Sequence, residues 1–153
     1  MLEIRPEGFA GRTSQVLLDG APVARWSARA WRSGGEIELA GETLVLRPAG
    51  WGRSFEMLAG ERVRATARRE GGHWRIAGEG AEYELTRPAG LRGRRRLLHG
   101  GRSVGEFRRT GLRGGLAADL SDVPATLQVF TGLVVLALWR RRNAAAAAAA
   151  SGG

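Results

Sequence analysis

The chain has no cysteine and no lysine, and it has only two histidines, His73 and His99. Without cysteine it can form neither a disulfide framework nor a thiolate metal site, and secretion is not suggested. Neither histidine stands in a His-Glu-x-x-His or comparable metal-binding spacing. We therefore expect no metal site, and we expect both histidines to lie at the surface beside turn glycines.

Motifs of catalysis are also absent. No serine stands in a Gly-x-Ser-x-Gly context, and the glycine-rich residues 49–53 lack the lysine and the following helix of a phosphate-binding loop. Glu36, Glu38 and Glu42 flank a turn, and acids at alternating strand positions are typical of a solvated face. The sequence therefore predicts a protein that is not an enzyme and that needs no cofactor.

Long apolar stretches are scarce. The N-terminal residues 1–9 include two glutamates and no apolar core, so they do not resemble a signal peptide, and we expect a cytoplasmic protein. The one long apolar run is residues 123–139, VPATLQVFTGLVVLALW. Asp122 is a candidate N-cap, Pro124 suits a first helical turn, and Arg140, Arg141 and Arg142 suit the negative end of a helix dipole.

A helix that is apolar on every face must be buried, either in a protein core or in lipid. Residues 123–138 would rise about 24 Å as a helix. This is short of the hydrocarbon core of a bilayer, which is about 30 Å thick. We favour burial in a protein core, with a tail-anchored membrane protein, in which 123–139 is the transmembrane helix, as the alternative.

The rest of the chain repeats itself. A corner phrase containing an arginine and then a glycine or a large apolar residue recurs, as in residues 2–9 (LEIRPEGF), 44–51 (LVLRPAGW) and 85–91 (LTRPAGL). Tight-turn signals such as Asp19-Gly20 and Ala59-Gly60 stand midway between corners. We expect Trp31, Trp51 and Trp74, which lie just after corners, to pack as lids on a barrel end.

These corners and turns delimit about twelve short strands. They are expected near residues 2–5, 14–18, 22–28, 35–39, 42–47, 54–58, 62–68, 73–77, 81–86, 94–98, 103–108 and 115–120. Closure into a barrel removes the exposed edges of such a meander. A barrel wider than about eight strands needs a filling. The predicted fold is mainly β: a closed antiparallel barrel of about twelve short strands built from hairpin repeats and filled by one apolar C-terminal helix.

Hairpin repeats followed by an apolar helix that ends in Trp139-Arg140-Arg141 resemble the tubby C-terminal-like superfamily. This superfamily includes tubby domains, phospholipid scramblases and LURP-one-related proteins, and the similarity extends to small bacterial proteins of this layout. It spans residues 2–142 and implies a twelve-stranded barrel around a central helix. No lipid-binding or calcium-binding motif of that superfamily has a counterpart here, so the resemblance implies no site residue.

Charge supplies the remaining functional signal. All 24 basic residues are arginines, and against 15 acids they give a net charge of +9, which favours anionic partners. Two neighbouring clusters form the candidate anion- or lipid-binding site: Arg92, Arg94, Arg95 and Arg96, and Arg102, Arg108, Arg109 and Arg113. The alternative to anion binding is a structural role, in which these arginines pair with nearby glutamates.

We therefore expect one domain, residues 1–142, whose central helix covers about 123–142, and an alanine-rich frayed or disordered tail, residues 143–153. The expected function is that of a non-enzymatic binding or scaffold module, a monomer, cytoplasmic and peripheral to the membrane, that contacts anionic phospholipid headgroups. A basic nucleic-acid-binding module is the further alternative.

Overall fold

Twelve strands precede a single long helix in the computed structural model, which describes residues 1–9, 12–27 and 34–152. The strands are β1 (Leu2–Glu7), β2 (Thr13–Leu18), β3 (Ala21–Ser27), β4 (Gly35–Leu39), β5 (Glu42–Ala49), β6 (Ser54–Ala59), β7 (Arg62–Glu70), β8 (His73–Gly78), β9 (Ala81–Thr86), β10 (Arg94–His99), β11 (Arg102–Thr110) and β12 (Gly115–Leu120). A 3-10 turn, η1 (Gly50–Gly52), separates β5 from β6, and the helix is α2 (Ala125–Ser151).

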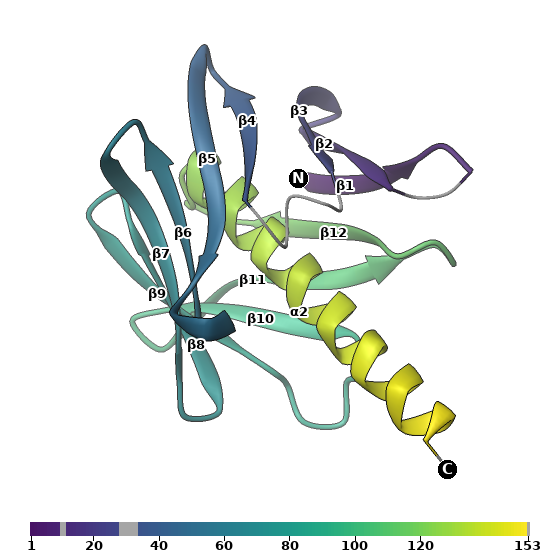
Figure 1. Cartoon of the computed structure of the whole chain (residues 1–153). Coiled ribbons are helices and arrows are strands. Elements are labelled where there is room, and N and C mark those ends of the chain that lie inside the picture. Colours follow the sequence, from purple (N-terminus) through teal and green to yellow (C-terminus); the bar gives the residue numbers. More distant parts are fainter. Residues whose placement is uncertain (10–11, 28–33, 153) are drawn as a thin grey trace.

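The strands form one antiparallel sheet that is nearly closed into a barrel around α2 (Figure 1). Pairing of β1 with β12, with Leu2 opposite Ala118, joins the two ends of the meander. The sheet order runs from β3 at one edge to β4 at the other, and no ladder joins these two strands within the described residues. The predicted helix-filled barrel of about twelve strands is confirmed, with a seam between β3 and β4.

Local chemistry explains the short strands. Asp19 and Gly20 both have positive φ, 50° and 81°, as do Ala40 and Gly41, which matches the tight turns that suit the twist of antiparallel strands. The pairing register shifts at Leu17, Leu58 and Leu98, each within two residues of such a turn. Bulges of this kind bend a strand and increase its twist, which helps a sheet to close.

The apolar helix fills the barrel, as its composition requires. Every side chain from Val129 to Trp139 is buried, and Leu127 is buried as well. Gly132 lets α2 approach β1 closely, because a Cβ built there would lie 2.6 Å from Leu2 Cδ2. The predicted N-cap was wrong: the cap is Pro124 without a side-chain hydrogen bond, and Gln128 Nε2 instead donates to the Val123 carbonyl at 2.8 Å.

The helix also continues past the point where we expected it to fray. It runs through the alanine segment to Ser151, and the Gly152 amide donates to the Ala148 carbonyl at 3.2 Å. Alanine has the highest intrinsic helix propensity, so the segment can extend a helix that is already nucleated inside the barrel. Within the described ranges, no helix combines the length and the apolar character needed to cross a membrane.

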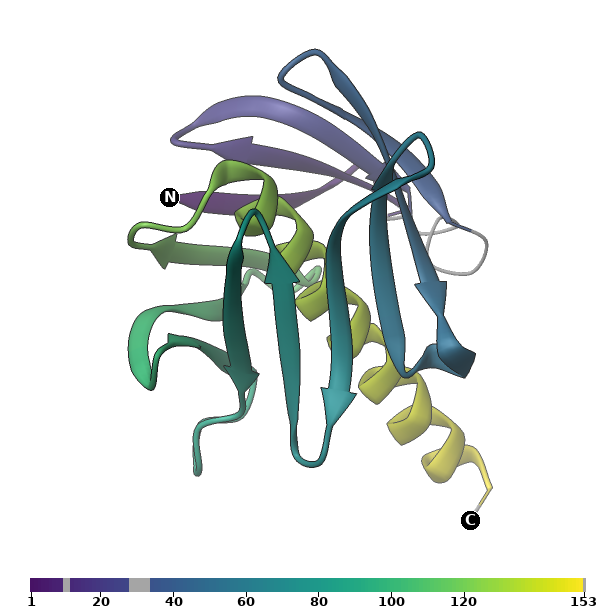
Figure 2. The ribbon, with the colours of Figure 1, turned by 90° about the vertical axis from the view of Figure 1, so that its left-hand side faces the viewer.

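The meander gives the barrel two different ends (Figures 1 and 2). We call the end where α2 begins the entry end; its connections are residues 19–20, 40–41, 60–61, 79–80, 100–101 and 121–124. We call the other end, past which α2 projects, the exit end; its described connections are residues 8–9 and 12, 34, 50–53, 71–72, 87–93 and 111–114.

Candidate anion-binding end of the barrel

Charge is segregated between the two ends. In the described part of the chain, the exit-end connections carry five exposed arginines and no carboxylate, whereas the entry-end connections carry four exposed carboxylates and no arginine. The arginines are Arg12, Arg53, Arg87, Arg92 and Arg113, and the carboxylates are Asp19, Glu61, Glu79 and Asp122. The exit-end connections are therefore positive and the entry-end connections negative, and two of the entry-end carboxylates are paired, Asp19 with the N-terminal amine and Glu79 with Arg64 at 2.9 Å.

The helix adds to the positive end, because Arg140, Arg141 and Arg142 follow its last buried residue, Trp139. Arg141 Nη1 donates to the Gly52 carbonyl at 2.7 Å, and its guanidinium lies 4.7 Å from the centre of the Phe55 ring. These contacts fix the basic segment of α2 against the η1 corner.

Arg95 brings a further charge into the same region from the barrel wall. It lies two residues before the buried Leu97 on β10, so it shares the inward face of the strand. Its Nε is buried and has no hydrogen-bond partner. Burial, and then the neighbouring charges of Arg87 and Arg142, lower the pKa of Arg95 to about 10. Burial also lowers the pKa values of Arg140 and Arg141.

No carboxylate in the described ranges neutralises this group of partly buried arginines. Glu7 and Glu70, the carboxylates that are the last residues of β1 and β7 at this end, pair elsewhere: Glu7 with Arg25 at 3.5 Å, and Glu70 with Arg75 at 2.9 Å. Confined positive charge without a counter-ion favours the binding of an anion.

A small pocket of about 110 Å³ opens beside α2 at this end. Arg109, Arg113, Arg140 and Asn143 contribute its polar lining, and Leu136 and Trp139 contribute its apolar lining. The Arg109 guanidinium lies 5.1 Å from the centre of the Trp139 ring, and its Nη2 donates to Asn143 Oδ1 at 3.3 Å. The pocket offers three guanidinium groups and one amide to an oxyanion.

The structure divides the eight arginines predicted from the sequence. Arg92, Arg95, Arg109 and Arg113 gather at the exit end. Arg94 and Arg96 lie on the outer wall and pair with Glu106 at 2.8 Å and 3.5 Å. These two arginines therefore form the ion pairs that were the predicted alternative to anion binding.

The remaining two predicted arginines, Arg102 and Arg108, differ in position. Arg108 lies on the outer wall, opposite Arg94 in the ladder of β10 and β11. Arg102 borders the entry-end turn at residues 100–101. The predicted clusters are therefore not a single patch.

Sequence reasoning missed Arg12, Arg53, Arg87 and the three arginines of α2 as members of the site. The signal was present in the corner phrases, since every second connection of an antiparallel meander lies at the same end. Grouping residues by alternate connections instead of by sequence clusters would have brought these arginines together.

Exposed apolar side chains accompany them. Phe9, Trp51 and Leu112 have relative exposures of 96%, 104% and 107%, and each lies on a different exit-end connection. The prediction that Trp51 is a barrel lid was therefore wrong, because its side chain contacts no core. Trp74 is buried, with its ring centre 5.6 Å from that of Phe55. Trp31 lies outside the described residues.

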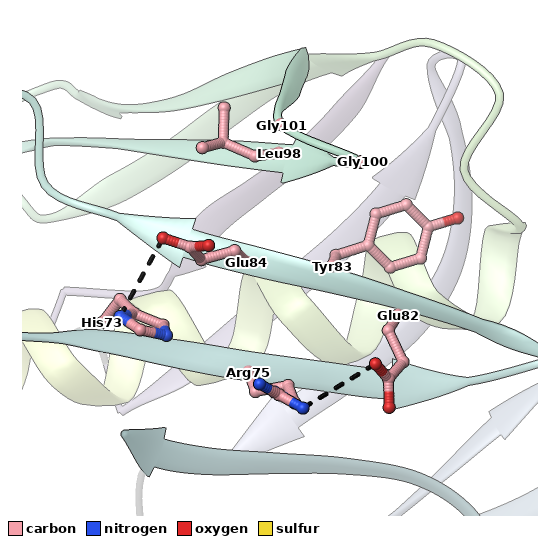
Figure 3. A pocket seen from close by; sticks show the side chains of 8 residues that line it. All are labelled: His73, Arg75, Glu82, Tyr83, Glu84, Leu98, Gly100 and Gly101. Carbon is pink, nitrogen blue, oxygen red and sulfur yellow. Dashed lines mark ion pairs between the residues drawn. The ribbon is translucent and has the colours of Figure 1, made fainter. Parts of the chain in front are cut away.

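A second hollow lies on the outer wall across β8, β9 and β10 (Figure 3). It has a volume of about 220 Å³, and its ionisable side chains include His73, Arg75, Glu82 and Glu84. Arg75 lies 3.8 Å from Glu82, and His73 lies 3.9 Å from Glu84, so acids and bases face one another across adjacent strands. Within the described ranges, no group of three potential ligands could hold a metal ion.

No protein-family model matches the chain, and no curated protein or solved structure shows significant similarity to it.

Proposed function

We propose that this protein is a non-enzymatic binding module that docks on anionic membrane surfaces through the exit end of its barrel. The observation that carries the proposal is the separation of charge, with arginines and no carboxylates on the described exit-end connections and the reverse arrangement at the entry end. A negative membrane surface attracts each nearby basic residue by about 1 kcal/mol. The same field repels the acidic entry end, so the charge pattern orients the protein.

The arrangement favours a surface over a nucleic-acid strand. Single-stranded nucleic acid is usually bound in a positive groove that follows the backbone. Here five arginines are distributed over separate loops around the projecting helix, and the pocket lined by Arg113, by Arg109 of β11 and by Arg140 of α2 has a volume of only about 110 Å³. A nucleic-acid-binding module is the competing function.

We also propose membership of the tubby C-terminal-like superfamily. The proposal is supported by the agreement between the layout of that superfamily, a twelve-stranded barrel around a central helix, and the strand order and buried helix found here. It rests on architecture and carries no site residue.

Flotation with vesicles tests the docking proposal. We expect binding to phosphatidylcholine vesicles that contain phosphatidylserine, no binding to phosphatidylcholine alone, and a decrease with salt as surface charges become screened. An exit-end variant should lose binding; it carries Arg53→Gln, Arg87→Gln, Arg92→Gln and Arg113→Gln.

A matched variant removes the same number of exposed charges from the wall and the entry end. It carries Arg5→Gln, Arg47→Gln, Arg62→Gln and Arg102→Gln. This variant should retain most of the binding. Equal losses in the two variants, or absence of binding to acidic vesicles at low ionic strength, would reject the proposal. Retention of short DNA or RNA in a gel, without vesicle binding, would establish the competing function.

A further inference from the structure

We propose that Phe9, Trp51 and Leu112 insert into the apolar part of the membrane–water interface, so that the barrel docks end-on. This inference rests on the proposed function, because it describes how the exit end engages a bilayer after charge has brought it there. It adds a second contact of a different chemical kind.

The exposure of these three side chains is the first observation. Each is essentially as exposed as it would be in an extended chain, with relative exposures of 96–107%. The other exposed large apolar residues of the described chain, Met1, Val63 and Leu91, reach only 43–49%. Scattered apolar residues are normal on a protein surface, but three complete exposures at one end of a barrel mark an interaction surface.

The backbone at Trp51 is the second observation. Trp51 has φ of +56°, a left-handed conformation that is uncommon for a large aromatic residue, and it lies between Gly50 and Gly52, which also have positive φ. Since its side chain is fully exposed, no packing within the barrel offsets this conformation. Backbone strain of this kind is concentrated at functional sites.

The presence of an arginine close in sequence to each of the three apolar side chains is the third observation. Arg12, Arg53 and Arg113 follow Phe9, Trp51 and Leu112 by three, two and one residues. Arg113 also reaches the neighbouring loop, where its Nη1 donates to the Gly8 carbonyl at 3.5 Å and its guanidinium lies 5.6 Å from the centre of the Phe9 ring. Apolar side chains with cations nearby suit the membrane interface, where anionic headgroups lie next to acyl chains.

The chemistry of these three apolar side chains selects a bilayer as the partner. Phe9 and Trp51 could each stack on a nucleic-acid base, but Leu112 has no π-face and gains nothing from such a partner. All three side chains gain from contact with acyl chains. The part of α2 that projects past the exit-end loops carries no charged side chain after Arg142, so end-on docking brings an uncharged helix end into the interface together with Phe9, Trp51 and Leu112 (Figure 2).

Because the chain has no cysteine, a fluorophore can be attached at a single introduced cysteine. Single cysteines replace Phe9, Trp51 or Leu112 and carry a polarity-sensitive fluorophore, and Ser121→Cys provides a control at the entry end, where Ser121 is exposed. With phosphatidylserine-containing vesicles, we expect the three exit-end labels to shift to shorter wavelength and to become quenched by brominated acyl chains. The label at position 121 should remain unchanged.

A triple variant, Phe9→Ser, Trp51→Ser and Leu112→Ser, separates insertion from attraction. Since these side chains are fully exposed and none is part of the core, its melting temperature should stay close to that of the wild type. Vesicle partitioning should fall at least about tenfold while its salt dependence is retained, because the arginines are intact. Labels that stay in an aqueous environment on vesicle-bound protein would overturn insertion and leave charge-driven docking in place. Failure of the unlabelled protein to float with acidic vesicles would reject docking and insertion together.

Discussion

At the scale of single residues, Arg95 shows a conflict between stability and binding. It faces inward on β10 with a buried, unpartnered Nε, close to the charges of Arg87 and Arg142. Such an arrangement weakens the folded state, and replacing a partly buried charge with an apolar side chain of similar length often stabilises a protein. The charge is therefore explained better by an external anion than by folding.

Substitution of Arg95 by methionine should separate the two effects. We expect the free energy of unfolding to rise by about 1 kcal/mol, a value reduced from that of full burial because the head group retains some solvent contact. Vesicle binding should weaken at the same time. Denaturant titration and flotation of Arg95→Met measure the two changes, and a variant that loses stability would show that Arg95 supports the fold.

The pH dependence of stability has a definite sign at this residue. Because the pKa of Arg95 is lowered to about 10 in the folded state, the folded protein holds this proton less tightly than the unfolded chain does. The destabilising contribution is complete below pH 10 and is relieved as the pH rises towards the pKa of an unfolded arginine. The stability gain of Arg95→Met over the wild type should therefore shrink above pH 10 when denaturant titrations are compared across that range.

At the scale of elements, α2 holds the barrel together from inside. Leu133 is fully buried near the middle of the apolar segment, and an unpaired carboxylate there would have no compensating partner. Leu133→Asp should unfold the whole domain, with loss of the β-sheet circular dichroism signal. An unchanged melting temperature would contradict the role of α2 as the core of the barrel.

Close packing between α2 and β1 gives a milder test. Gly132 lies in the buried middle of the helix, where a Cβ would meet Leu2 Cδ2 at 2.6 Å and Ile4 Cδ1 at 3.3 Å. The gain in helix propensity from replacing glycine should be outweighed by overpacking, which typically costs about 1–3 kcal/mol. Gly132→Val should lower the midpoint of urea unfolding, and a rise would show that the interface has spare volume.

The sequence predicted these elements well because each obeys a local rule. Turn pairs such as Asp19-Gly20 require positive φ, and a helix that is apolar on all faces requires a surrounding core. The positions of α2's first and last residues were predicted less well. Which group caps the helix near Pro124, and whether the helix extends through the alanine segment, each depend on small energy differences. Composition does not reveal these differences.

The functional site was predicted only in part, for a geometric reason. Arg92, Arg95, Arg109 and Arg113 gather at the exit end, but Arg102, which is also near in sequence, borders the opposite end. In an antiparallel meander, successive connections lie at opposite ends of the sheet, and every second connection lies at the same end. Trp51 was misplaced for a similar reason: its corner phrase resembles that of buried aromatics, and only the conformation of residues 50–52 turns its side chain outward.

At the scale of the whole molecule, the connections of the barrel are segregated by charge, and exposed apolar side chains lie on the positively charged connections. The net charge of +9 alone would favour any polyanion, whereas the segregation of charge gives a preferred orientation. Raising the ionic strength should therefore weaken vesicle binding by at least about tenfold, since screening shortens the range of surface charges to a few ångströms. Partitioning that does not respond to salt would indicate a contact dominated by apolar insertion.

Hydrogen–deuterium exchange on phosphatidylserine-containing vesicles tests the central claim most directly, because it reports which end of the barrel meets the membrane. The account predicts slower exchange in the exit-end connections 50–53, 87–93 and 111–114, and unchanged exchange in the entry-end turns 19–20, 60–61 and 79–80. Protection of the entry-end turns, or equal protection of both ends, would contradict docking through the exit end.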